Sequence, residues 1–89
     1  MARYVALVDE RPGAVGIVVP DLPGCTSGGA TVGAALRNAA EAVSLWIEDA
    51  RMDGEKIPNP RSAEKLRNDP AIAAALAQGG ILSGVPLTR

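Results

Sequence analysis

The stretch AVGIVVPDLPGC, residues 14–25, decides how this chain folds. Its first half alternates larger with smaller side chains, and the larger set is Val15, Ile17 and Val19. This period of two predicts a strand whose larger side chains face the core. Pro20 ends the strand, because proline has no N–H to donate to a neighbouring strand. Residues 20–24, with two prolines and a glycine, are therefore expected to form a stiff loop.

Two further strands are predicted beside this one. Residues 3–8 form an apolar run rich in β-formers, which predicts a strand. Residues 10–13 predict a four-residue turn, because Pro12 presets φ at the first central position and Gly13 tolerates a positive φ at the second. The strands on either side of the turn then make an antiparallel hairpin. Residues 25–28 are expected to add a short third strand.

A long helix is predicted from Thr31 onward, because threonine is a good N-cap residue. Apolar side chains then recur every three or four residues and give the helix one apolar face. This stripe consists of Val32, Leu36, Ala39, Val43, Trp46 and Ala50. The helix is expected to end near Met52, with Gly54 as its stop. The stripe is interpreted as part of the core.

The last third of the chain predicts shorter elements. Residues 57–60, Ile-Pro-Asn-Pro, are expected to be extended, because each proline disfavours helix in the residue before it. Two short helices follow, at 62–67 and 70–78, the first capped by Ser62 and the second by Asp69. Residues 81–87 predict a final strand at the edge of a sheet, since a glycine and a proline within it do not suit a central strand.

These elements predict an α+β fold with a three-stranded antiparallel sheet, one long helix packed on it, short helices and a fourth strand at one edge. The 89 residues are expected to form a single domain, residues 1–89. Hydrophobic residues make up 47%, but Tyr4 and Trp46 are the only aromatics, so the core is expected to be thin and aliphatic. A lone domain this small is marginally stable, which favours a homo-oligomer, a dimer or a tetramer.

Charge is distributed unevenly although the net charge is only −1. Residues 1–50 hold three basic and six acidic residues, and residues 51–89 hold six basic and four acidic ones. An acidic first half suits a basic protein partner, and it equally fits an ordinary solvated surface. There is one cysteine, no signal peptide and no apolar run that approaches about 18 residues. The expected location is the cytoplasm, with no membrane contact.

Few side chains could perform catalysis. Histidine is absent, so neither a zinc site nor a cysteine nucleophile is predicted, and Cys25 is interpreted as a small buried hydrophobe. Ribonuclease-H-like nucleases also begin with a hairpin, a strand and a helix, and they hold two metal ions with carboxylates. Here Asp9 is placed at or beyond the end of the first strand, Glu41 and Glu48 lie on the helix, and the last strand holds no acid. We therefore expect no catalytic residue, no metal and no cofactor.

Nucleic-acid and phosphate binding also lack support. The glycines of residues 24–33 lead into a helix N-terminus, which can bind an anion, but no Gly-Lys-Ser/Thr ending follows them. Turns and close packing explain these glycines better. The chain has no aromatic stacking platform, zinc finger or basic recognition helix. Arg61, Lys65 and Arg67 alternate with acidic residues and are interpreted as a solvated face.

A combination of short motifs resembles the N-terminal domain of the HicB antitoxins over about residues 3 to 62. The most distinctive is Val-Pro-Asp-Leu-Pro-Gly-Cys at 19–25. It is followed by Ser27, Gly29, a helix that opens at Thr31 and contains Ala35-Leu36 and Asn38-Ala39, then Asp53-Gly54 and Ile-Pro-Asn-Pro at 57–60. Each motif alone is weak, and the order and spacing of all of them make the resemblance.

This resemblance implies a partial ribonuclease-H-like fold and a binding function. HicB proteins sequester HicA, a small basic toxin that cleaves RNA, by covering its active face. The implied partner is therefore a HicA-like toxin. Many HicB proteins also carry a C-terminal DNA-binding domain, and residues 63–89 are too few to hold one. Direct operator binding is therefore not expected.

Two questions stay open at the level of sequence. The expected partner-binding residues are Asp21, Leu22, Pro23, Asp9 and Glu10. Asp21 would meet a cation of the toxin, or else the loop is only a rigid corner whose prolines lower the entropy of the unfolded chain. The alternative function is an orphan oligomeric scaffold or small-ligand-binding domain that keeps the fold without a toxin. A short basic reading frame next to the gene would favour the antitoxin.

Overall fold

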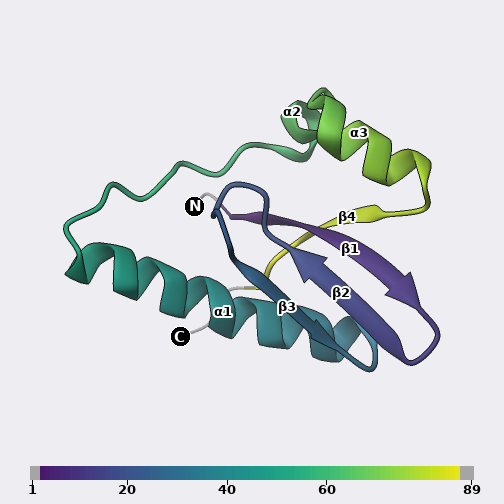
Figure 1. Ribbon diagram of the computed structural model, residues 1–89, viewed down its shortest axis with the longest axis horizontal. Coiled ribbons are helices and arrows are strands. Elements are labelled where there is room, and N and C mark those ends of the chain that lie inside the picture. The colour runs from purple at the N-terminus through teal and green to yellow at the C-terminus, as the bar shows by residue number, and fades with distance from the viewer. Residues whose placement is uncertain (1–2, 87–89) are drawn as a thin grey trace.

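The computed structural model describes residues 3–86 and has four strands and three helices in that range. Figure 1 shows α1 crossing one side of the sheet, and a long connection that returns from the end of α1 to the two short helices. The elements, in chain order, are β1 Val5–Arg11, β2 Ala14–Val18, β3 Thr26–Gly29, α1 Val32–Met52, α2 Ala63–Arg67, α3 Pro70–Ala77 and β4 Ile81–Gly84. The predicted α+β class is confirmed.

The sheet is antiparallel throughout, with the strand order β3-β2-β1-β4. β4 pairs with β1, since Leu7 lies opposite Leu82, so the strand predicted near the end of the chain is confirmed as an edge. It ends at Gly84 rather than at Leu87, which lies outside the described residues. The sheet therefore brings the first and last described parts of the chain side by side.

The hairpin between β1 and β2 is tighter than the sequence predicted. Arg11 pairs directly with Ala14, so only Pro12 and Gly13 lie between the paired strands, rather than the four residues 10–13. Gly13 has a φ of 71°, the positive value expected for this position. Because the turn is short, β1 extends to Arg11, and Asp9 lies within the strand rather than at its end. β3 is likewise shifted by one residue from the predicted 25–28.

The core lies between the sheet and α1. The alternation predicted for β2 is confirmed, because Val15, Ile17 and Val19 are buried and Val18 is 46% exposed. In β1, the buried residues Ala6 and Val8 face the same way. Every residue of the buried cluster between the sheet and α1 is hydrophobic, so apolar contacts hold these two layers together.

Alanines, rather than the larger residues of the predicted stripe, make the closest contacts of α1. The fully buried positions of this helix include Ala35 and Ala40, which the stripe omitted, while Leu36 and Trp46 are only half-buried. A Cβ built on Gly29 would lie 2.8 Å from the backbone nitrogen of Ala35. Small side chains on both elements thus let α1 approach β3 closely.

The helices begin at the predicted capping residues. The hydroxyl of Thr31 accepts a hydrogen bond from the N–H of Ala34 (3.1 Å), and α1 ends at Met52, before Gly54 with its φ of 70°. Ser62 and Asp69 cap α2 and α3 as predicted. Within residues 3–86, no helix combines the length and the apolar character that crossing a bilayer requires.

The short helices lie next to the face of the sheet that is turned away from α1. Alternation places Leu7, Asp9 and Arg11 on the face away from α1. These three side chains line a cavity together with Ala75 and Gln78 of α3. The two faces of the sheet are therefore covered differently. The helix α1 covers one face, and α3 lies beside β1 on the other face.

Candidate protein-binding surface

The loop of residues 19–25 is closed on itself by its own backbone. The N–H of Val19 donates to the carbonyl of Cys25 (3.0 Å), and the N–H of Cys25 donates to the carbonyl of Leu22 (2.9 Å). Leu22 is 0% exposed and Cys25 only 4%. Burial raises the pKa of the Cys25 thiol, which fits the interpretation of this cysteine as a buried hydrophobe. The loop thus inserts its apolar side chains into the core.

Asp21 is held by Arg61, 40 residues later in the chain. Its carboxylate accepts hydrogen bonds from the backbone N–H of Arg61 (2.6 Å) and from Nε of the same residue (2.7 Å). Nη1 of Arg61 also reaches Oδ2 of Asp69 (3.2 Å). We call these three residues the arginine clasp. It ties the loop to the connection that precedes α2 and to the first turn of α3.

The clasp adds to one sequence interpretation. The Arg61 side chain is 38% exposed and so does lie at the surface, but its guanidinium is also paired with two carboxylates. Nothing in the local sequence predicts this pairing, since Asp21 and Arg61 meet only after the chain has returned along α1 (Figure 1). The hydrogen bonds that Arg61 donates to Asp21 and Asp69 raise the pKa of its guanidinium, so the cation is retained at every pH of interest.

Two aromatic side chains fix the same corner. Nε1 of Trp46, on α1, donates to the carbonyl of Pro23 (2.9 Å), and the hydroxyl of Tyr4 donates to the carbonyl of Pro58. Burial, with a smaller contribution from the charge of Asp21, raises the pKa of the Tyr4 phenol. Trp46 therefore ties the loop to α1, and Tyr4, just before β1, ties the connection after α1 to the sheet.

The five predicted partner-binding residues fall into two separate groups. Asp21, Leu22 and Pro23 lie beyond one end of β2, and Asp9 and Glu10 lie beside the hairpin turn at its other end (Figure 1). The side chain of Leu22 is buried, and that of Asp21 is 8% exposed and engaged in the clasp. Pro23, Asp9 and Glu10 are exposed. The geometry gives Asp21 and Leu22 a role in holding the loop, and partner contact by this set stays a prediction.

Other exposed side chains on α1 were missed by the sequence analysis. Leu45 is 62% exposed and Met52 is 79% exposed, although both are large and apolar. Their signal in the sequence is that they fall outside the apolar stripe of the helix. A groove of about 500 Å³ lies next to them, lined by Pro23, Trp46, Asp49, Ala50, Asp53, Glu55, Lys56 and Pro58.

The carboxylates of a nuclease are not brought together. Asp9 lies on the sheet face away from α1, whereas Glu41 and Glu48 lie on α1. Asp9 instead pairs with Arg11 at 3.1 Å in an exposed position. Within residues 3–86, no three side chains of the metal-binding types are grouped closely enough to hold an ion.

The arginine clasp predicts a dependence of stability on acid. The hydrogen bond from Arg61, followed by that from the N–H of Ala71, holds the pKa of Asp69 below its usual value of 3.8. A carboxyl whose pKa is lowered on folding contributes stability above its unfolded-state pKa, and this contribution is lost as the pH falls through its folded-state pKa. We therefore expect the urea midpoint of unfolding to fall as the pH drops below about 4.

Asp69→Asn tests the charge alone, because asparagine is an equally good N-cap residue. This substitution should lower the urea midpoint of unfolding near pH 7, and it should reduce the additional fall of that midpoint at acid pH. Asp53→Asn is the matched control, since Asp53 is exposed and caps α1 through its backbone N–H. Equal pH profiles for Asp69→Asn and the wild type would show that the pair of Asp69 with Arg61 contributes nothing to stability.

A protein-family comparison matches residues 4–78 to the HicB-like antitoxins of bacterial toxin–antitoxin systems. Among curated proteins, an uncharacterized 14.9 kDa protein of Haemophilus phage HP1 is 43% identical over 54 residues, which are 61% of this chain and 41% of the phage protein. A UPF0150 protein of Thermoplasma acidophilum is 37% identical over 64 residues, which are 72% of this chain and 93% of that protein.

Solved structures share the fold over almost the whole chain. The Burkholderia pseudomallei antitoxin HicB has a TM-score of 0.74 at 27% identity, covering 99% of this chain and 63% of that one. A chain of the HicA3 and HicB3 toxin–antitoxin complex has a TM-score of 0.76 at 26% identity, covering 97% and 98%. This chain thus spans less than two thirds of the phage protein and of the Burkholderia antitoxin. Because the family match extends from the first strand to the end of α3, the chain belongs to the HicB-like antitoxin family.

Proposed function

We propose that this chain is the antitoxin of a type II toxin–antitoxin pair and neutralises a HicA-like, RNA-cleaving toxin by direct contact. The observation that carries the proposal is the shared fold with a chain of a toxin–antitoxin complex, which this chain covers over 98% of its length. The family match over residues 4–78 supports the same function. The fold of that complex chain is thus shared over almost its whole length.

The proposed action is binding and not catalysis. The separation of Asp9 from Glu41 and Glu48 by the sheet supports this, because a two-metal nuclease needs its carboxylates around one pair of ions. A binding protein needs only a surface that fits the active face of the toxin. Such an antitoxin acts in stoichiometric amounts and in the compartment of its toxin, which we propose is the cytoplasm.

We further propose that the chain forms one domain and acts as a homo-oligomer, a dimer or a tetramer. Both outer strands of the sheet support self-association, because β3 and β4 each have one side unpaired within the described residues. Sedimentation of the purified chain tests this point. A mass equal to that of the monomer at every concentration would contradict it.

The function is tested by adding increasing amounts of the purified chain to the toxin encoded by the neighbouring gene. RNA cleavage should fall in proportion to the chain added and stop at a fixed molar ratio, and the two proteins should elute together in gel filtration. An unrelated ribonuclease is the control and should be unaffected. Separate elution with undiminished cleavage would refute the antitoxin function.

A further inference from the structure

The side of α1 turned away from the core carries an unusual mixture of residues. Leu45 and Met52, at 62% and 79%, are the most exposed large hydrophobic side chains of the described residues. Spacings of four and three residues place them on one face of the helix. The members of this face, which we call the outer face of α1, are Glu41, Leu45, Glu48, Asp49 and Met52. Its two apolar side chains are thus surrounded by carboxylates.

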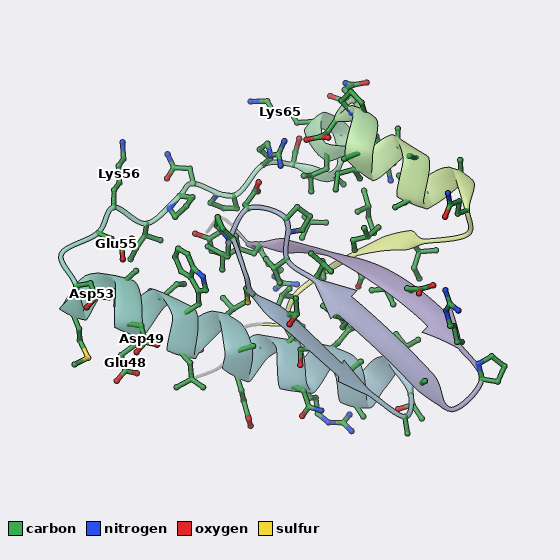
Figure 2. The ribbon with its side chains drawn as sticks, viewed as in Figure 1. Glu48, Asp49, Asp53, Glu55, Lys56 and Lys65 are labelled. Carbon is green, nitrogen blue, oxygen red and sulfur yellow. The ribbon has the colours of Figure 1, made fainter. Side chains whose placement is uncertain are left out.

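The groove beside α1 continues this surface. Its apolar part is formed by Pro23, Trp46, Ala50 and Pro58, and its acidic part by Asp49, Asp53 and Glu55. Figure 2 shows Glu48 and Asp49 projecting from the C-terminal half of α1, with Asp53 and Glu55 beside the end of the helix. Because Asp49 belongs to both, the outer face and the groove form one surface.

The charges of this surface are largely uncompensated by the chain itself. None of the ion pairs found within residues 3–86 involves Glu41, Glu48, Asp49, Asp53 or Glu55, since all of these pairs involve Arg11 or Arg61. The nearby basic residues are Arg37, Arg51 and Lys56, so the five acids outnumber the bases. A cationic partner would find carboxylates whose charge no internal ion pair has neutralised.

Acidic side chains of this surface also lie near the C-terminal end of α1, where negative charge is least favourable for a helix. The C-terminal end of a helix carries a partial negative charge, so acidic side chains there oppose folding. The first turn of α1, where acids would be favourable, contains none. Glu48, Asp49 and Asp53 thus reduce the stability of the helix on which they lie, and a positive ligand would relieve this repulsion.

We propose that the outer face of α1 and the adjoining groove form the docking surface for a basic, amphipathic segment of the toxin. Lysine or arginine side chains of that segment meet the carboxylates, and its apolar side chains cover Leu45 and Met52. Exposed apolar residues inside a ring of charge are the arrangement of a binding patch, in which central contacts give affinity and outer charges speed association. This inference rests on the proposed function and names the surface that performs it.

Binding of the toxin to three variants tests the surface. Glu48→Lys with Asp49→Lys reverses two charges, and Leu45→Ala with Met52→Ala removes the apolar contacts. The control combines Glu64→Lys, Asn68→Lys and Gln78→Lys, which makes the same change in net charge at exposed positions on and beside α2 and α3. Lysines near the C-terminal end of α1 suit the helix dipole, so the charge variant is expected to fold. Circular dichroism and a urea titration check the folding of all three.

We expect calorimetric titration to show Kd raised about 100-fold or more by the charge reversal, about 10-fold by the two alanines and less than about 3-fold by the control. Added salt should weaken wild-type binding and have much less effect on the charge variant. Should the charge reversal leave the chain unfolded, Glu48→Gln with Asp49→Asn replaces it, with an expected loss of about 10-fold.

Three outcomes would overturn the inference. Wild-type affinity in both α1 variants would leave the antitoxin function intact and remove this surface from it. An equal loss in the control would assign the effect to net charge. Dissociation of the homo-oligomer by the α1 variants, seen in sedimentation, would make a second copy of the chain the occupant. Failure of the wild type to bind the toxin is distinct, because it refutes the proposed function itself.

Discussion

Gly29→Ala is expected to lower the free energy of unfolding by roughly 3 kcal/mol, the upper part of the range for overpacked sites. The added Cβ would lie 2.8 Å from the nitrogen of Ala35 and 3.1 Å from two further backbone atoms of α1. Backbone atoms cannot change rotamer to make room, so the whole helix must move away from β3. For a domain with a total stability of about 0.05–0.15 kcal/mol per residue, this is a large fraction.

Gly16→Ala is the matched control for this change. Gly16 also lies within a strand, but a Cβ there meets nothing within 4 Å. Alanine in a strand is favoured over glycine by roughly 0.5–1 kcal/mol, so this variant should be as stable as the wild type or more so. Urea unfolding followed by the fluorescence of Trp46 measures both. Equal stability of the two variants would show that α1 does not need the space at Gly29.

Leu22→Ala is expected to cost about 2–5 kcal/mol, the range for a buried leucine truncated to alanine. Leu22 is completely buried within the core cluster, although it lies in a loop between two prolines. The cavity left behind would loosen the loop, and with it the position of Asp21 in the arginine clasp. Thermal unfolding should move down by more than about 8 °C, since each kcal/mol shifts the midpoint by roughly 4–8 °C in a domain of this size.

Leu45→Ala is the control with the same chemical change, because Leu45 is 62% exposed. Its stability should stay within about 0.5 kcal/mol of the wild type, as for most surface changes. Toxin binding provides the second measurement, and the two variants are expected to differ in opposite ways: Leu22→Ala loses stability and Leu45→Ala loses affinity. A Leu22→Ala protein of normal stability that no longer binds the toxin would instead support Leu22 as a contact residue.

Comparing Leu22→Ala with Leu45→Ala separates a role in folding from a role in toxin binding, which the sequence motif did not distinguish. Asp21, Leu22 and Pro23 attract attention because they form the most distinctive string in the chain. The structure uses Leu22 as a core residue, Asp21 as the partner of Arg61, and the carbonyl of Pro23 as an acceptor for Trp46. A distinctive motif can thus reflect the demands of a compact corner as well as those of a binding site.

The sequence by itself determined the elements whose cause is local. The alternation of β2, the caps Thr31, Ser62 and Asp69, and the glycine that follows α1 all act within a few residues, so each could be inferred from its own neighbourhood. The family resemblance rested on several such local motifs in a fixed order, from residues 19–25 to residues 57–60, and the fold class that it implied is confirmed.

Only the tertiary structure decided which distant residues meet. The pairing of β4 with β1, the capture of Asp21 by Arg61 and the contact of Gly29 with Ala35 depend on how the elements pack. The outer face of α1 became visible for the same reason, because exposure is known only once the core is in place. The periodicity of a sequence indicates that a helix has an apolar side. It does not indicate which distant segment covers that side, because this depends on the packing of the whole chain.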